Sequence, residues 1–349
     1  CIVLALDVFF YSIPIMPRPK IALLYVGGSI GMKVNQKTNR IEPIESLTEI
    51  HRFLPELQRE VSLTFYSLTN VGSSDVTPAN WVEIAEKINE IYDEYEGFVV
   101  VHGSNTLSYT AAALSFALQG LSKPVVLTGA LHPINDIAGD GRMNLIYAIR
   151  TAQQDIAEVC VVFGPRVLRG NRVKKVDQSL FKTFDTLTMP ALAEFNLGIH
   201  LHPDRFVRRK RTLKCIPSFD PQIRIITIFP GIFDSKCLDA MLKSEPHGIV
   251  LRTYGPGMLP ESLFDWLREV TKANVPVVTT SQAIRGQVDL QRYRRQLTLE
   301  RLGVMSGSNM TFECAAAKLM WAITQAKNMG RLRDIMEKSL VGEFDETRR

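Results

Sequence analysis

Short apolar runs alternate along the chain with segments whose apolar residues recur every three or four positions. Eight runs have the length and composition of buried strands, namely 21–26, 61–66, 97–102, 124–128, 158–163, 223–229, 247–253 and 275–280. In segment 80–95, Ile84, Ile88 and Ile91 fall on one face of a helix. Similar spacing predicts further helices at 107–119, 143–153, 236–243, 260–272, 310–328 and 330–339. This alternation favours an α/β architecture rich in parallel strands.

The region 201–222 interrupts the alternation with three prolines and a strongly basic run at 205–214, RFVRRKRTLK. A chain of 349 residues is long enough for two domains. We therefore expect a linker at 201–222, between an N-terminal catalytic α/β domain at 16–200 and a smaller C-terminal α/β domain at 223–349.

The basic run supplies most of the net charge of +5, because without its six basic residues the balance would be slightly negative. A run of this kind can bind nucleic acid. No pattern of stacking aromatic residues accompanies it. A solvated linker or hairpin face is the favoured interpretation, and nucleic acid is not an expected partner.

Residues 1–15, CIVLALDVFFYSIPI, are apolar but are interrupted by Asp7 and Pro14. The run is too short to span a bilayer. It lacks a starting Met, a basic flank and a small-residue cleavage site, so we expect an extension rather than a targeting signal, and no membrane association. The five cysteines are scattered without C-x-x-C. This spacing argues against a disulfide framework or a zinc site, and it favours a cytoplasmic location.

Three polar clusters lie beyond the carboxyl ends of predicted strands, after 21–26, 97–102 and 158–163. They are Gly27-Gly28-Ser29, His102-Gly103-Ser104-Asn105-Thr106 and the run 169–175, RGNRVKK. Ligands of open α/β sheets bind beyond the carboxyl ends of the strands. We therefore expect a site where these clusters meet.

The first cluster lies within the sequence GGSIG, which is compatible with several kinds of site. Its glycines do not fit G-x-G-x-x-G, and the Lys-Ser/Thr of a P-loop is missing, which argues against nucleotide binding. It matches the elbow motif G-x-S-x-G, but at most one strand precedes it. His200 and His202 lack a nearby third ligand, so no metal site is expected.

Ser29 and Ser104 beside a lysine can instead form a hydrolase site. A lysine whose pKa is lowered by burial can activate a hydroxyl. Backbone N–H groups at the neighbouring glycines can stabilise an oxyanion. The alternative is that each serine is only a turn or cap residue.

Seven motifs occur in a fixed order along the chain: VGGSIG at 26–31, SSDVTP at 73–78, HGSNTL at 102–107, YTAAALSF at 109–116, GDGRMNL at 139–145, RGNR at 169–172 and LRTYG at 251–255. Together they resemble the bacterial-type L-asparaginase family, specifically its cytoplasmic type I branch, over about residues 19–345. The resemblance implies a two-domain fold, with a larger N-terminal Rossmann-like sheet domain and a smaller C-terminal parallel-sheet domain.

The resemblance also implies an activity. In this family the side-chain amide of L-asparagine is hydrolysed to L-aspartate and ammonia through an acyl-enzyme. Ser29 matches the nucleophile, while Ser104, Asn105 and Lys175 match the group that activates a hydroxyl or water, with Lys174 a rival for Lys175. No cofactor is implied. The active site is completed by a neighbouring subunit, which implies a homodimer or homotetramer.

The resemblance further implies five substrate-binding residues. Ser73 matches a serine that contacts the substrate α-carboxylate, and the full set is Ser73, Ser74, Gly28, Gly103 and Ala130.

Several positions depart from the family pattern. Ser29 and Ser104 replace threonines, which keeps the hydroxyl and loses the methyl that restrains it. The loop 32–43 lacks the family's tyrosine, and Gly255-Pro256-Gly257-Met258 lacks an asparagine.

Asn105 replaces an aspartate, which removes a negative charge. Binding of free asparagine should weaken by about 1–2 kcal/mol, and the pKa of Lys175 should fall. An amide whose α-nitrogen is uncharged is therefore an alternative substrate. A non-catalytic paralogue and a tRNA-linked amidotransferase subunit are alternative functions.

Overall fold

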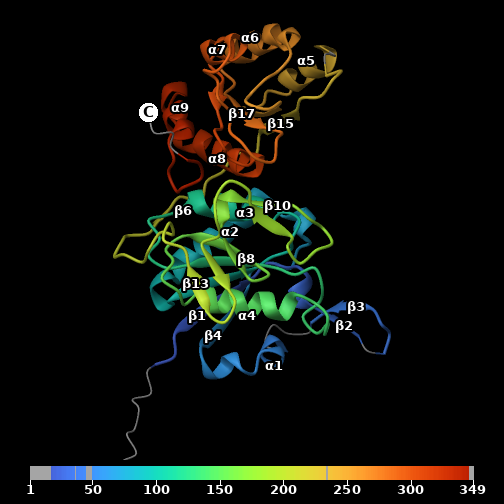
Figure 1. The fold of residues 1–349 in the computed structure, drawn as a ribbon, viewed down its shortest axis with the longest axis vertical. Coiled ribbons are helices and arrows are strands. Elements are labelled where there is room, and N and C mark those ends of the chain that lie inside the picture. The colour runs from blue at the N-terminus through green and yellow to red at the C-terminus, as the bar shows by residue number, and fades with distance from the viewer. Residues whose placement is uncertain (1–16, 36, 45–48, 233–234, 346–349) are drawn as a thin grey trace, which may run out of the picture.

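The computed structural model describes residues 17–35, 37–44, 49–232 and 235–345. The expected extension at 1–15 lies outside the described residues. Figure 1 shows two bodies stacked along the long axis, the first formed by the earlier part of the chain and the second, in orange and red, by the later part.

The first body is built on an eight-stranded sheet. Its strands lie in the order β13 (Ile199–Leu201), β12 (Ala193–Phe195), β9 (Arg166–Arg169), β8 (Val159–Phe163), β7 (Val125–Thr128), β5 (Gly97–Val101), β1 (Lys20–Tyr25) and β4 (Ser62–Ser67). Five neighbouring strands, β8, β7, β5, β1 and β4, run parallel to one another. The strands β9, β12 and β13 pair antiparallel, so one edge of the sheet departs from the parallel arrangement that the sequence predicts.

Helices cover both faces of this sheet. Leu24 of β1 lies in a core with α2 (Pro78–Glu90) and α3 (Leu107–Ala117), whereas its neighbour Leu23 lies in a core with α1 (Ile50–Phe53) and α4 (Gly141–Thr151). Successive residues of a strand point to opposite faces. A strand buried on both faces therefore appears in the sequence as a continuous apolar run.

The second body has a parallel four-stranded sheet. Its strands lie in the order β15 (Ile223–Thr227), β16 (Gly248–Thr253), β17 (Val277–Ser281) and β18 (Met305–Ser306). Its helices are α5 (Ser235–Lys243), α6 (Phe264–Lys272), α7 (Arg294–Arg301), α8 (Phe312–Gln325) and α9 (Met329–Glu337). In Figure 1, α8 lies between this sheet and α3 of the first body. Phe116 of α3 stacks on Trp321 of α8, with ring centroids 6.1 Å apart, so the two bodies share an apolar interface.

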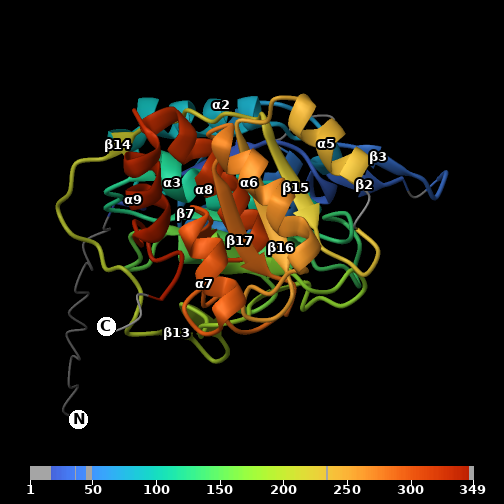
Figure 2. The same cartoon turned by 90° about the horizontal axis from the view of Figure 1, so that it is seen from above.

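Three small two-stranded sheets complete the fold. They pair β2 (Met32–Val34) with β3 (Ile41–Pro43), β10 (Val173–Lys175) with β11 (Phe184–Thr186), and β14 (Lys214–Cys215) with β6 (Leu118–Gln119). Figures 1 and 2 both show the β2–β3 hairpin projecting from the body. The β14–β6 pairing ties the expected linker to the first sheet domain.

Two arginines of the basic run contact the end of α4 rather than lying free in solvent. Arg208 donates to the carbonyl oxygens of Ala152 and Gln154, at 3.1 and 2.7 Å. Arg205 binds the backbone and the carboxylate of Asp155. Cations at a helix C-terminus are stabilising. Part of the run is therefore structural, whereas residues 209–212 are exposed, in line with the expected solvated face.

None of the helices in the described part of the chain combines the length and the apolar character that crossing a bilayer requires. The domain limits 16–200, 201–222 and 223–349 stay predictions.

Candidate active site

The loops that follow β1, β4, β5 and β7 meet at the carboxyl-terminal end of the parallel strands of the first sheet. We call this end of the strands the edge that carries the candidate site. These strands are parallel and adjacent, so their carboxyl ends lie side by side. The loops carry Ser29, Ser73, Ser104 and Ala130 respectively. Parallel topology therefore brings together loops as far apart in the chain as those of Ser29 and Ala130.

The loop after β1 approaches the loop after β5 through two glycines. Gly28 has φ +95°, and a Cβ built on it would lie 2.8 Å from both Cα and N of Gly103. Only glycine fits such a contact in this conformation. Ser29 then begins a short 3₁₀ helix, Ser29–Gly31, and is partly buried. Within the described residues, the Ser29 hydroxyl has no hydrogen-bond partner, so it is available to a bound molecule.

A buried chain of hydrogen bonds fixes the loop after β5. Trp81 Nε1 donates to Thr110 Oγ1, at 3.0 Å, and Thr110 in turn lies 3.0 Å from His102 Nε2. His102 Nδ1 lies 2.7 Å from the carbonyl oxygen of Gly103, which can only accept. His102 is therefore a neutral imidazole protonated at Nδ1. Burial lowers the pKa of His102 to about 4, which keeps it neutral at physiological pH.

Ser73 joins the loop after β4 to the loop after β5. Its carbonyl accepts from the Thr106 hydroxyl at 2.6 Å, and its own hydroxyl accepts from the Asn105 N–H at 3.4 Å. Gly103 also packs against it, because a Cβ on Gly103 would lie 2.6 Å from Ser73 Cβ. Ser74, the next residue, is exposed. The structure thus places Ser73 against the Ser104 loop.

Ala130 is buried where the loop after β7 turns towards α4. The N–H groups of Leu131 and His132 donate to the Asp140 carboxylate, at 3.0 and 3.1 Å. Asn144 also donates to that carboxylate, at 3.0 Å. Asn144 also donates to the carbonyl oxygen of Gly129, at 2.9 Å, so these bonds hold the backbone on either side of Ala130.

Lys175 reaches the Ser104 loop from strand β10. Its ammonium nitrogen lies 3.1 Å from Ser104 Oγ and 3.0 Å from Asn105 Oδ1. Burial lowers the pKa of Lys175. A lowered pKa increases the fraction of the neutral amine, which is a base.

Lys174, the rival lysine, points the other way. Its ammonium binds Glu313 Oε1 at 2.8 Å and lies over the ring of Phe312. Adjacent residues of a strand face opposite sides. Of the two lysines, the structure brings only Lys175 into contact with Ser104.

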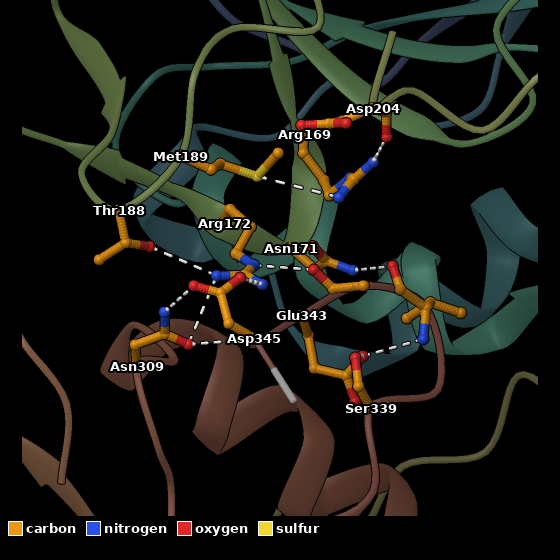
Figure 3. Close-up of polar contacts among 12 residues, drawn as sticks. Arg169, Asn171, Arg172, Thr188, Met189, Asp204, Asn309, Ser339, Glu343 and Asp345 are labelled. Carbon is orange, nitrogen blue, oxygen red and sulfur yellow. Dashed lines mark hydrogen bonds and ion pairs between the residues drawn. The ribbon is translucent and has the colours of Figure 1, made fainter. Parts of the chain in front are cut away.

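The rest of the run 169–175 does not reach this edge, contrary to expectation. Figure 3 shows Asn171 and Arg172 directed at a later part of the chain. Asn171 donates to the Val341 carbonyl at 2.8 Å, and Arg172 donates to the Gly342 carbonyl at 2.7 Å. These residues join the two bodies instead of lining the site.

Within the part of the chain that the structure describes, this end of the sheet therefore combines an unpaired hydroxyl at Ser29 with a second hydroxyl, at Ser104, that contacts a partly buried lysine. A base, a nucleophile and glycine-rich backbone are the parts that acyl transfer requires. Among the described residues, no cluster of three or more His, Cys, Asp or Glu is placed to hold a metal ion.

Comparison with known families decides the relationship. The model for the N-terminal domain of asparaginases matches residues 20–206, and that for the glutaminase/asparaginase C-terminal domain matches residues 222–336. The chain belongs to the asparaginase family. The predicted family and its two-domain fold are thus confirmed.

Three relatives illustrate how far this asparaginase similarity extends. The chain is 33% identical to L-asparaginase 1 of Escherichia coli strain K12, over 94% of this chain and 99% of the relative. The crystal structure of L-asparaginase I from Vibrio cholerae O1 biovar eltor matches with a TM-score of 0.87 and 33% identity, over 95% of this chain and all of that chain. The L-asparaginase of Dirofilaria immitis is 32% identical, over 93% of this chain and 60% of that longer relative.

The residues that support the site were missed by reasoning from the sequence. His102 lies within the motif HGSNTL, but its hydrogen-bond partner Thr110 is 8 positions later in the chain. Trp81, the partner of Thr110, lies 29 positions before Thr110. The position of His102 directly after the wholly apolar strand Gly97–Val101 could have indicated that its side chain is buried. Asp140 could have been found as an acidic residue at the start of a helix.

Proposed function

We propose that this protein is an amidohydrolase that converts L-asparagine to L-aspartate and ammonia. The observation that carries the proposal is the contact of Lys175 with Ser104 and Asn105, at the end of the sheet where the loop after β1 places Ser29. Membership of the asparaginase family supports it.

In the proposed reaction Ser29 Oγ attacks the side-chain amide carbon. Neutral Lys175 takes up the proton of the Ser29 hydroxyl through the Ser104 hydroxyl. The oxyanion that forms on the amide oxygen is stabilised by backbone N–H groups beside Gly28 and Gly103. The C–N bond breaks as the proton passes to the leaving nitrogen, which departs as ammonia. Water, activated by the same lysine, then hydrolyses the ester on Ser29 and releases aspartate. Ser73 is proposed to bind the α-carboxylate.

Asn105 favours a second candidate substrate. Its Oδ1 accepts a hydrogen bond from Lys175 but carries no charge for an α-ammonium. A hydrogen bond to a charged group contributes about 1.5–3 kcal/mol, against about 1 kcal/mol for a neutral one. An asparagine whose α-nitrogen is acylated carries no α-ammonium, so its binding would not be weakened by the missing charge at position 105. We propose it as the alternative substrate.

We also propose that the enzyme acts in the cytoplasm as a homodimer or homotetramer. Light scattering of the purified chain tests the oligomer. A role in a tRNA-linked amidotransferase would require tight, salt-sensitive binding of tRNA.

The decisive experiment measures ammonia release from asparagine, glutamine and N-acetylasparagine by the protein and by Ser29→Ala. Release that disappears in Ser29→Ala is the expected result, and the best substrate identifies the role of Asn105. A folded protein that releases ammonia from none of the three, but is stabilised thermally by asparagine, would be a binding protein instead.

A further inference from the structure

The strand that carries Lys175 has little support from its own sheet. β10 has three residues, and its only strand partner in the described structure is β11. A two-stranded sheet is marginally stable by itself. Val173 packs in the core of the first body, and contacts of the charged side chains beside it must complete the positioning of Lys175.

The first such contact is the ion pair between Lys174 and Glu313. The Lys174 ammonium lies 2.8 Å from Glu313 Oε1 and 4.3 Å from the centroid of the Phe312 ring. The Glu313 side chain is only 8% exposed and belongs to the first turn of α8. A pair with such a buried partner is less screened by solvent than a surface pair. One face of β10 is thus attached to the second body, and the opposite face presents Lys175.

A second contact lies just before the strand. Arg172 is buried, and besides the Gly342 carbonyl it binds the Asp345 carboxylate at 2.8 Å. Figure 3 shows the guanidinium enclosed by Asp345, Asn309 and Thr188. Both charged residues on either side of Val173 are therefore held by groups from the second half of the chain.

The segment that Arg172 binds, 340–345, is itself anchored. Glu343 lies 2.6 Å from Lys318 of α8, and neither side chain is exposed to solvent. The Glu343 carboxylate also accepts from the N–H groups of Leu340 and Val341. A buried charge pair that is fully hydrogen-bonded defines one geometry, and losing either partner leaves a buried charge uncompensated. The 340–345 segment is therefore a fixed support for Arg172.

We propose that the second body positions the base of the active site. In this proposal the Lys174–Glu313 ion pair, assisted by the contact of Arg172 with the 340–345 segment, holds β10 so that the Lys175 amine meets Ser104. Lys174 is a positioning residue, because it touches neither Ser104 nor the proposed substrate. The inference rests on the proposed function for its kinetic consequences.

The main test is Lys174→Met, which keeps an apolar stem and removes the ion pair. We expect kcat to fall about 10- to 100-fold, the effect of a small misplacement of a catalytic group. KM should stay within about twofold, because the substrate contacts are untouched. Lys174→Arg should restore most of the activity by keeping the pair. The matched control is Lys272→Met, which removes an exposed pair with Glu269. A folded Lys174→Met enzyme with wild-type kcat would overturn the proposal.

Glu313→Gln separates position from charge. Lys174→Met removes a cation near Lys175, whereas Glu313→Gln leaves that cation unpaired. A purely electrostatic influence on Lys175 should therefore act in opposite directions in the two variants. Loss of position predicts a lower kcat in both. Opposite effects on kcat would contradict the positioning role.

Hydrogen exchange provides a readout that does not depend on activity. In Lys174→Met, the amides of 173–186 should exchange at least about tenfold faster than in the wild type, while the amides of β5 stay unchanged. Unchanged exchange across 173–186 would contradict the proposal. If the wild type hydrolyses no amide, the proposed function fails, and the exchange measurement still decides whether Lys174 holds β10.

Discussion

The loops after β1 and β5 both present a serine directly after a glycine, yet they hold it differently. Ser104 stands in a loop fixed by the His102 hydrogen bonds and by Ser73, with its hydroxyl 3.1 Å from a lysine amine. Ser29 stands in a turn shaped by backbone contact with Gly103, and its hydroxyl has no partner within the described residues. A hydroxyl beside a base is suited to moving a proton, and an unengaged one is suited to attack. The same dipeptide, Gly-Ser, is thus suited to a different role in each loop, because the surrounding described residues engage only the Ser104 hydroxyl.

The largest expected effect comes from removing Lys175, the base that contacts the Ser104 loop. Lys175→Met should lower kcat by about 10²–10⁴-fold, the usual contribution of general acid–base catalysis. In the wild type, kcat should rise with pH as Lys175 loses its proton. The midpoint of that rise should lie below 10.5, because burial lowers the pKa of Lys175. A pH–rate profile of both proteins checks this. If kcat still rises with pH in Lys175→Met, the rise reflects the titration of a group other than Lys175.

The next effect tests the backbone contact that shapes the Ser29 turn. Gly28→Ala should reduce the free energy of unfolding by about 2 kcal/mol or more, because its φ is +95° and the new Cβ would meet Gly103 at 2.8 Å. Urea denaturation measures the change. The control is Gly198→Ala, where an added Cβ meets nothing within 4 Å. Equal stability of the two variants would show that the two loops do not need this close approach.

A smaller effect concerns the hydrogen bonds that fix the Ser104 loop. The pKa of His102 is about 4 in the folded state, against about 6.5 in the unfolded state. As the pH falls from 6.5 to 4 the unfolded chain binds a proton that the folded chain does not. Stability present above pH 6.5 is therefore lost through this window, by about 2 kcal/mol at pH 5. His102→Gln should remove this loss from the pH dependence of unfolding. An unchanged dependence would exclude His102 as its source.

The smallest expected effect alters the charge beside Lys175. Asn105→Asp should lower KM for free asparagine about tenfold, since the restored carboxylate can bind the α-ammonium. It should also move the rise of kcat to higher pH, because a nearby anion raises the pKa of Lys175. Steady-state kinetics across pH measures both. N-acetylasparagine serves as the control substrate, since it has no α-ammonium to gain. A KM that falls equally for both substrates would contradict this role of position 105.

The sequence predicts the central strands well and the outer ones poorly. β5 is buried on both faces, so its residues GFVVV form an apolar run. β12 and β13 have three residues each, AEF and IHL, and lie at an edge partly open to solvent. Three residues are too few to show alternation. α7 was missed for a similar reason, because its sequence RRQLTLER buries only Gln296 and Leu299.

The candidate site could be predicted in part. Ser29 and Ser104 follow strands that the apolar pattern identifies, and parallel strands bring their ends together. The choice between Lys174 and Lys175 could not be made, because it depends on which way a three-residue strand faces. That orientation is fixed by Glu313, which is 139 positions away from Lys174. A contact at such a distance leaves no local pattern in the sequence.

The contact of Arg172 with the 340–345 segment has a consequence for synthesis on the ribosome. Arg172 and its partner Gly342 are 170 positions apart, so the first body emerges and folds long before that partner is translated. Until then the strand that carries Lys175 lacks its contacts with the second body and is held only by the first, in whose core Val173 packs. A nascent or prematurely released polypeptide that lacks this segment would therefore carry a folded first body whose Lys175 is less well placed, and it would hydrolyse its substrate more slowly than the complete chain.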